Sequence, residues 1–281
     1  MEELIKRAAQ DLANSSYAIA LTGAGMSTES GIPDFRGPSG IWTKNPDAER
    51  RAYRSYEFFM ENPKGWWVER VTGPNIFGDL AGYSPNAGHI AIGDLEKYGI
   101  LKTVITQNID GLHEKGGTKN LLEYHGCALK LRCVSCLSRM RREEIDLELL
   151  LKEDRLPPVC SVCGGVIKTD TVGFGEPIPE DVAEKSLEEA WKCDLMLICG
   201  TSAVVYPFAN LPRIARQKKA NYEIYIDPSE GKRPTGKTTV IEINAEPTPL
   251  TQEGISDYLI QGRIGEILPK IAAEVMRIRQ I

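Results

Sequence analysis

The chain has little histidine and no excess of basic charge. Only three of its 281 residues are histidines, and 34 lysines and arginines stand against 39 acidic residues. This balance gives no general electrostatic reason to bind nucleic acid or anionic lipid. No apolar run approaches the roughly 20 residues that a membrane-spanning helix needs. We therefore expect no membrane partner and no strong nucleic-acid interaction.

The first residues also lack the apolar core of a secretory signal peptide. Charged residues separate the apolar positions Leu4, Ile5, Ala8 and Leu12, whose spacing is that of a surface helix. Four of the seven cysteines are paired at metal-binding spacing, which is not the pattern of a disulfide framework. Together these features predict a cytoplasmic protein.

Short apolar runs alternate with stretches of helical periodicity along most of the chain. The runs are residues 17–21, 103–106, 195–199, 222–226 and 239–243, and the helical stretches include 87–98, 182–192 and 265–279. Buried parallel strands separated by helices have this pattern. The predicted fold class is therefore α/β, with a Rossmann-like parallel sheet.

Two segments interrupt this alternation. Residues 37–84 are rich in aromatic and charged residues and contain no clear strand run, and residues 130–169 contain the paired cysteines and a charged, helix-like stretch. We interpret both as insertions that together build a small domain, with a helical part and a zinc ribbon. The Rossmann-like, dinucleotide-binding domain would then comprise residues 1–36, 85–129 and 170–281.

The paired cysteines indicate a metal site. Cys133-Val-Ser-Cys136 and Cys160-Ser-Val-Cys163 are two C-x2-C motifs separated by 23 residues. Four thiolates suit tetrahedral zinc, and an iron–sulfur centre would use the same ligands. A zinc ion with four protein ligands has no open position for water or substrate. We therefore expect a structural metal; four unconnected buried thiols are the alternative.

A glycine-rich turn follows the first predicted strand. Gly23 and Gly25 would let the main chain approach a pyrophosphate, with the N-terminus of a following helix facing the anion. The motif departs from the usual dinucleotide fingerprint because Thr28 stands where the third glycine or alanine belongs. By itself the turn is a weak indication of nucleotide binding.

Further motifs make the pattern specific. They are GAGMSTESGIPDFRG from Gly23, QNIDGLH from Gln107, the pair His125-Gly126, both cysteine motifs, Phe174-Gly175-Glu176, Gly200-Thr201-Ser202 and Glu242-Ile243-Asn244. In this order, and over nearly the whole chain, they strongly resemble the sirtuin family of NAD-dependent protein-lysine deacylases. The resemblance implies transfer of an acyl group from lysine to ADP-ribose, with release of nicotinamide and O-acyl-ADP-ribose. NAD and zinc are the implied cofactors.

The resemblance also implies roles for individual residues. Implied catalytic residues are His125, Asn108 and Asp110. Implied NAD contacts are Gly23, Ala24, Gly25, Ser27, Ile32, Asp34, Phe35, Arg36, Gln107, Asn108, Ile109, Asp110, Gly200, Thr201, Ser202, Asn244 and Ile264. Implied contacts to an acyl-lysine protein or peptide are Val172, Phe174, Gly175 and Val204. The metal ligands are the four cysteines already named.

The three histidines have different expected roles. His125 would accept a proton relayed through the ribose hydroxyls, because histidine titrates nearest to neutral pH. His89 lies in a helix-like stretch and is expected to be structural. His113 ends the QNIDGLH motif, and we expect it to support the site through a hydrogen bond.

Several positions depart from the family pattern. Gly173 stands where a bulky residue is usual, and Cys127 where serine or threonine is usual. Residues 62–67 lead into Val71-Thr72-Gly73-Pro74, where desuccinylating members carry a tyrosine and an arginine that bind an acyl carboxylate, and neither residue is present there. We therefore predict neutral acyl groups over succinyl or malonyl.

Three other functions remain open on the sequence. Two are enzymatic: a protein mono-ADP-ribosyltransferase and a hydride-transferring dehydrogenase on the same fold. The third is a binding module in which the zinc ribbon docks a partner and the NAD site is regulatory. The combined GAG, QNID and HG motifs favour the deacylase.

Overall fold

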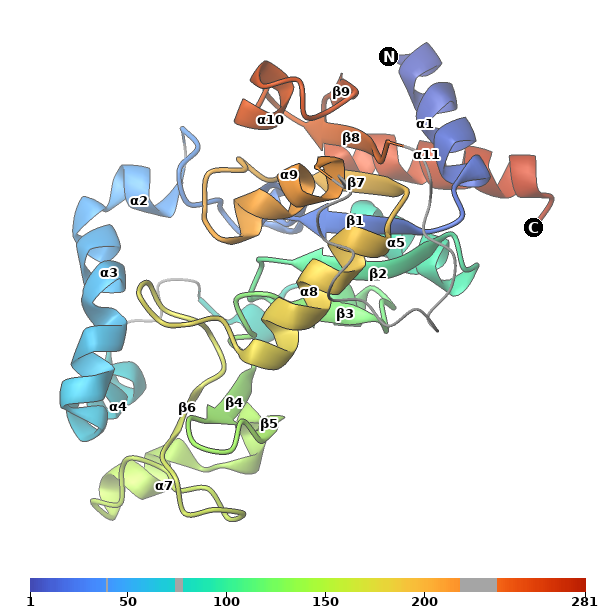
Figure 1. Ribbon diagram of the computed structural model, residues 1–281. Coiled ribbons are helices and arrows are strands. Elements are labelled where there is room, and N and C mark those ends of the chain that lie inside the picture. The colour runs from blue at the N-terminus through green and yellow to red at the C-terminus, as the bar shows by residue number, and fades with distance from the viewer. Residues whose placement is uncertain (39, 74–77, 218–236) are drawn as a thin grey trace.

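The computed structural model describes residues 1–38, 40–73, 78–217 and 237–281 (Figure 1). The strand expected at residues 222–226 lies outside the described residues. Among those that are described, none of the helices combines the length and apolar character needed to cross a membrane.

The larger sheet has six parallel strands in the order β3-β2-β1-β7-β8-β9. Their bounds are β1 Ala18–Thr22, β2 Leu101–Thr106, β3 Leu121–Glu123, β7 Leu195–Cys199, β8 Thr239–Asn244 and β9 Tyr258–Gln261. Counted along the chain within this sheet, the order is 3-2-1-4-5-6, the arrangement of a doubly wound dinucleotide-binding fold. The predicted fold class is confirmed. The sequence pattern does not single out β9, because in this edge strand only Ile260 is fully buried.

Helices cover both faces of this sheet (Figure 1). On one face lie α1 (Glu2–Asn14), α5 (Ala87–Lys97) and α11 (Ile264–Arg279), packed over one apolar cluster. On the other lie α8 (Glu180–Lys192) and α9 (Leu211–Arg216), over a second cluster. Burial on both sides explains why β1 and β7 consist almost entirely of apolar residues.

The first insertion is helical, as expected. It contains α2 (Ile41–Lys44), α3 (Pro46–Glu61) and α4 (Pro63–Thr72). Asn45 and Asn62 each cap a helix by accepting a hydrogen bond from a main-chain N–H of the first turn, and a proline follows each asparagine. These two caps end one helix and start the next within a single residue.

The second insertion contains a three-stranded antiparallel sheet. Its strands β4 (Lys130–Cys133), β5 (Arg139–Arg141) and β6 (Ile167–Thr169) lie in the order β5-β4-β6, and the short helix α7 is Leu147–Lys152. Trp67 of α4 is fully buried and donates a hydrogen bond of 2.8 Å to the carbonyl of Ile167. The helical segment and the ribbon therefore share one apolar core.

Short helices complete the described chain. They are α6 (Leu112–Lys115), α10 (Pro249–Gln252) and the 3-10 turns Ala24–Met26, Thr28–Ser30, Leu80–Gly82, Arg142–Glu144 and Phe208–Asn210.

Candidate active site

A cleft of about 2100 Å³ opens at the carboxyl ends of the six parallel strands. Its other walls come from α2, α3 and α4 and from residues 142–148 and 169–178. Pockets for a single small ligand usually measure about 300–1,000 Å³. The cleft is therefore large enough for a dinucleotide together with part of a second substrate.

Most of the residues expected in the site line this cleft. They are Ala24, Gly25, Asp34, Phe35, Arg36, Gln107, Asn108, Ile109, His125, Val172, Phe174, Gly175, Gly200, Ser202, Asn244 and Ile264. Six expected residues do not line it. Gly23, Ser27, Ile32, Asp110 and Thr201 are buried behind its wall, and Val204 is exposed outside it.

The glycine turn packs against the chain that follows β7. The amide of Gly25 donates to the carbonyl of Gly200 at 2.8 Å, and a Cβ atom on Gly25 would lie 2.8 Å from the Cα of Gly200. Gly200 itself has a φ of +63°, and its Cβ would lie 2.4 Å from the amide nitrogen of Met26. Only glycine fits at both positions, so the two loops form a main-chain cradle at the switch point of the sheet.

The helix expected after this turn is not present. Two 3-10 turns take its place, Ala24–Met26 and Thr28–Ser30, and Gly31 ends them with a φ of +93°. The hydroxyl of Thr28 donates to the carbonyl of Gly25 at 3.0 Å, which favours a local turn over a continuing helix. A phosphate here would meet the amides of the cradle without the dipole of a long helix.

Behind the cradle lies a buried polar cluster. The hydroxyl of Ser27 donates to Asp110 at 2.7 Å, and the amide of Asn108 donates to Ser27 at 3.1 Å and to the carbonyl of Gly23 at 3.0 Å. The other carboxylate oxygen of Asp110 accepts from the amide of Leu112 at 2.9 Å. Asn108 is thereby fixed at the cleft wall, and Ser27 and Asp110 hold it from behind.

A second contact fixes the next wall of the cleft. The side-chain amide of Gln107 donates to the hydroxyl of Thr201 at 2.5 Å. Asn244 donates to the carbonyl of Thr201 at 3.3 Å. Thr201, itself out of the cleft, connects the chain that follows β2 with the chains that follow β7 and β8.

His125 lies directly after β3 and Tyr124, half-buried at the cleft wall. Its Nδ1 atom is 3.2 Å from the main-chain oxygen of Gln107, and its carbonyl accepts from the amide of Val172 at 2.8 Å. Burial lowers the pKa of His125 below its ordinary value, and the contact to Gln107 opposes that shift. The imidazole is therefore neutral at neutral pH.

The other two histidines are buried away from the cleft, as structural residues. His89 accepts from the amide of Asn86 and completes the cap of α5. His113 lies 2.8 Å from the hydroxyl of Thr22, which agrees with the hydrogen-bonded role expected for it, and its Nδ1 has no partner. The two rings are 4.9 Å apart, and burial lowers the pKa of His89 to about 4 and of His113 to about 3.

An aromatic wall connects the expected NAD and peptide regions. Phe35 lies 4.8 Å from Trp42, and Trp42 lies 5.7 Å from Phe174, between ring centroids. Phe174 is stacked on Tyr53 at 4.1 Å. The sequence prediction did not include Trp42 or Tyr53; the concentration of aromatic residues in the first insertion was the available signal.

Arg70 is another cleft residue that the sequence prediction overlooked. Its guanidinium lies over the ring of Trp66 at 4.1 Å and is 3.4 Å from the hydroxyl of Ser55. Loss of water around the guanidinium, and then the charge of Arg142, lower the pKa of Arg70 to about 10. Among the described residues it has no carboxylate partner within ion-pair distance.

The four motif cysteines meet at one point. Their Sγ atoms all lie within 4.8 Å of one another, with Cys133 and Cys163 at 3.5 Å and Cys136 and Cys160 at 3.8 Å. Four ligands about 2.3 Å from a tetrahedral zinc would be about 3.8 Å apart. The four thiols therefore fit a tetrahedral zinc ion and leave no coordination position open for water or substrate. Cys127, Cys193 and Cys199 are buried elsewhere, and burial raises the pKa of Cys127 and Cys199.

Comparison with known proteins agrees with this geometry. A model of the Sir2 family matches residues 23–207. The chain is 38% identical over 278 residues to an NAD-dependent protein deacylase of Pyrococcus abyssi, covering 99% of this chain and 100% of the relative. It is 41% identical to NAD-dependent protein deacylase 2 of Archaeoglobus fulgidus, with 99% of each chain covered.

Solved structures give the same result. A Sir2 homologue in complex with NAD is 33% identical, with a TM-score of 0.72 over 99% of this chain and 94% of the other. A Sir2 protein with a p53 peptide and NAD⁺ is 30% identical, with a TM-score of 0.68 over 96% of this chain and 97% of the other.

Proposed function

The chain belongs to the Sir2 family and is an NAD-dependent protein deacylase, and we propose that His125 is its general base. The observation that supports this most strongly is the contact between His125 Nδ1 and the carbonyl of Gln107. A carbonyl oxygen can only accept, so Nδ1 carries the proton and Nε2 keeps its lone pair. At Nε2, His125 can then accept a proton from a hydroxyl bound in the cleft.

We propose that NAD lies along the glycine cradle and the strand ends. When bound, it supplies the ADP-ribose that accepts the acyl group and the nicotinamide that is released. Gly25 and Gly200 support this placement, because a Cβ on either would clash with the main chain of the other loop, and only glycine lets the two loops come together at the switch point of the sheet. Asn108 and Gln107 would orient the nucleotide with their fixed amides, and Ser27 and Asp110 would keep Asn108 in place.

We propose that the acyl-lysine enters beside Val172, Phe174 and Gly175. The aromatic wall supports this, since it would exclude water from the lysine side chain near His125. The peptide would pair through its main chain with residues 172–175.

Neutral acyl groups remain our proposal for the preferred substrate. The cleft does hold Arg70, without a carboxylate partner among the described residues, so acetyl and succinyl peptides should be compared directly. Faster turnover of the succinyl peptide in the wild type would overturn the proposal. A selective loss of that turnover in Arg70→Leu would then identify the residue responsible.

We also propose a structural zinc and the two-domain division. Three apolar clusters support the division: two consist only of residues from 1–36, 85–129 and 170–281, and a third consists only of residues from 37–84 and 130–169.

We further propose a cytoplasmic location. The cluster of four free cysteines supports it, because such thiols persist in a reducing compartment. Cell fractionation would test the location.

One assay tests the proposed base. An acetyl-lysine peptide and NAD are incubated with the wild type and with His125→Ala, and both the deacetylated peptide and free nicotinamide are measured. We expect the wild type to form them in equal amounts and the variant to lose most deacetylation, with general-base loss of about 10²–10⁴-fold. Equal activity of the variant would refute His125 as base. ADP-ribose attached to protein would instead indicate the transferase.

A further inference from the structure

Residues 173–176 form a tight turn that closes on one carboxylate. The amide of Glu176 donates to the carbonyl of Gly173 at 3.1 Å, and the amide of Gly173 donates back to the Glu176 carboxylate at 2.8 Å. Gly175 has a φ of +78° within the turn. The preceding residue, Val172, is hydrogen-bonded to the carbonyl of His125. The conformation of this segment therefore depends on Glu176 at one end and on His125 at the other.

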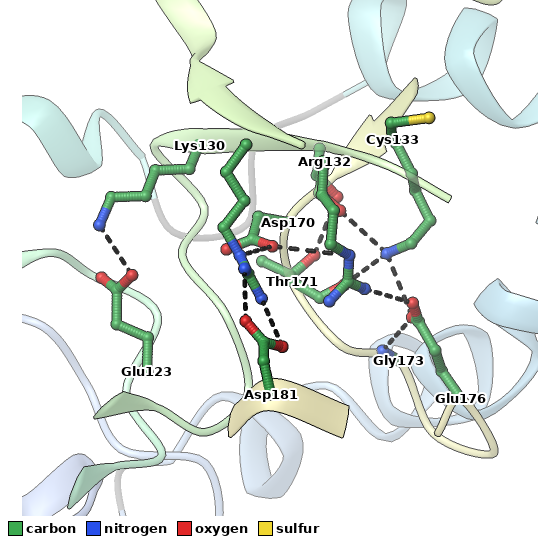
Figure 2. Close-up of polar contacts among 12 residues, drawn as sticks. Glu123, Lys130, Arg132, Cys133, Asp170, Thr171, Gly173, Glu176 and Asp181 are labelled. Carbon is green, nitrogen blue, oxygen red and sulfur yellow. Dashed lines mark hydrogen bonds and ion pairs between the residues drawn. The ribbon is translucent and has the colours of Figure 1, made fainter. Parts of the chain in front are cut away.

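The small sheet holds the same carboxylate. Arg132 of β4 donates to Glu176 Oε1 at 2.8 Å, and Lys168 of β6 lies 3.1 Å from Oε2. The side chains of Arg132, Lys168 and Glu176 are 4%, 3% and 6% exposed. Figure 2 shows Glu176 reached by Arg132 on one side and by the amide of Gly173 on the other. The turn at the cleft is thus tied to the ribbon through buried charges.

The strand register explains why a carboxylate is needed here. Arg132 and Lys168 are directly paired across β4 and β6, and the adjacent pair is Cys133 with Ile167. Like charges opposite each other destabilise a sheet. Glu176 contacts both cations, and Asp170 adds a second negative charge 3.6 Å from Arg132. The carboxylate position is therefore set by two paired strands, one of which ends at the metal-site cysteine Cys133.

Stability alone does not account for this arrangement. A buried ion pair adds little net stability compared with apolar residues of similar volume, because both charges lose their water. It does fix geometry, since the bonds to Glu176 come from three separate parts of the chain. The part that is fixed is the main chain of residues 173–175, which forms part of the cleft wall.

We propose that Glu176, held by Arg132 and Lys168, is a positioning residue that presents residues 172–175 for pairing with the substrate peptide. The proposal rests on the function proposed above, in which the acyl-lysine peptide binds along this segment. Through Glu176 the metal-holding ribbon determines peptide affinity without touching the peptide. His125 meets this segment through its main-chain carbonyl, while its imidazole contacts Gln107, and the printed contacts of Glu176 do not reach the NAD cradle. We therefore expect NAD binding and the rate of the bound complex to change little when the carboxylate is lost.

The test compares two carboxylate-to-amide changes in the same network. Glu176→Gln removes the shared charge, and Asp181→Asn removes the outer, half-exposed partner of Arg139 (Figure 2). For each variant the measurements are zinc content, NAD KM, peptide KM, kcat and the affinity of a fluorescent acetyl-lysine peptide by anisotropy. We expect Glu176→Gln to raise peptide KM and Kd by about tenfold with kcat, NAD KM and zinc near wild type, and Asp181→Asn to change none of them.

A second pair of variants, at Lys168, distinguishes loss of the charge from misfolding. Lys168→Gln should weaken peptide affinity, and Lys168→Arg, which keeps the charge, should restore most of it. Unchanged peptide affinity in Glu176→Gln overturns the proposal. So does a combined loss of zinc, NAD binding and turnover, because that marks a general structural role. If the wild type binds the peptide but does not deacylate it, the proposed function fails while the anisotropy comparison still decides the role of Glu176.

Discussion

A Cβ atom on Gly126 would lie 1.9 Å from the main-chain oxygen of Asp170. This close approach joins the chain that follows β3 to the start of the segment after β6, beside His125. Gly126 also has a φ of +70°, which L side chains rarely adopt. The glycine after His125 is therefore required by two separate constraints.

Replacing Gly126 by alanine should destabilise the protein severely. Gly254→Ala is the matched control, since its φ is +67° and nothing lies within 4 Å of its Cβ position. In the control, backbone strain should lower the free energy of unfolding by about 1–2 kcal/mol. In Gly126→Ala, the clash with Asp170 should lower it by about 1–3 kcal/mol more than in the control. Urea denaturation midpoints measure the loss of stability in both variants. Similar losses would mean that the main chain near Asp170 can shift to make room for the added Cβ.

The pH profile of turnover should report on His125. The neutral imidazole is the base, and burial lowers its pKa, so the active form predominates at and above neutral pH. We expect kcat to be flat above pH 7 and to fall as the pH drops through a value below the ordinary 6.5. An acid limb centred above 6.5 would contradict a half-buried imidazole whose pKa is lowered. His125→Ala should lose the limb altogether.

Loss of a metal ligand should unfold the ribbon and leave the NAD cradle intact. In Cys136→Ser we expect zinc to fall from about one per chain and amides of β4 to exchange faster with solvent, because metal binding and ribbon folding are coupled. Cys127→Ser is the control, as a buried cysteine outside the cluster. Retention of zinc in Cys136→Ser, or its loss in the control, would reassign the ligands.

The sequence predicted local features well and long-range contacts poorly. Strands β1, β2, β7 and β8 and the four-cysteine cluster follow from periodicity and spacing, which are local. The stacking of Tyr53 on Phe174 and the contact of Arg132 with Glu176 join residues far apart in the chain, and they depend on register and packing. The prediction of a helix after the glycine turn was wrong, because the hydrogen bond from the Thr28 hydroxyl to the carbonyl of Gly25 favours a short turn.

Acid should destabilise the fold through His89 and His113. Burial lowers their pKa values to about 4 and about 3, against 6.5 when unfolded. Above pH 6.5 both states are neutral, so the stability is complete there. As the pH falls below 6.5 the unfolded chain binds protons that the folded chain does not, and stability is lost until the folded groups titrate. Between pH 7 and pH 5, each histidine should lower the free energy of unfolding by about 2 kcal/mol.

His89→Asn separates this effect from the titration of carboxylates. The asparagine oxygen can replace Nδ1 as acceptor for the amide of Asn86, so the cap of α5 is kept while the titrating group is removed. We expect the variant to lose about half of the fall in unfolding free energy between pH 7 and pH 5, measured by urea denaturation at each pH. A fall as steep as in the wild type would assign the acid sensitivity to other groups. With His113 still present at 2.8 Å from Thr22, the remaining half should persist.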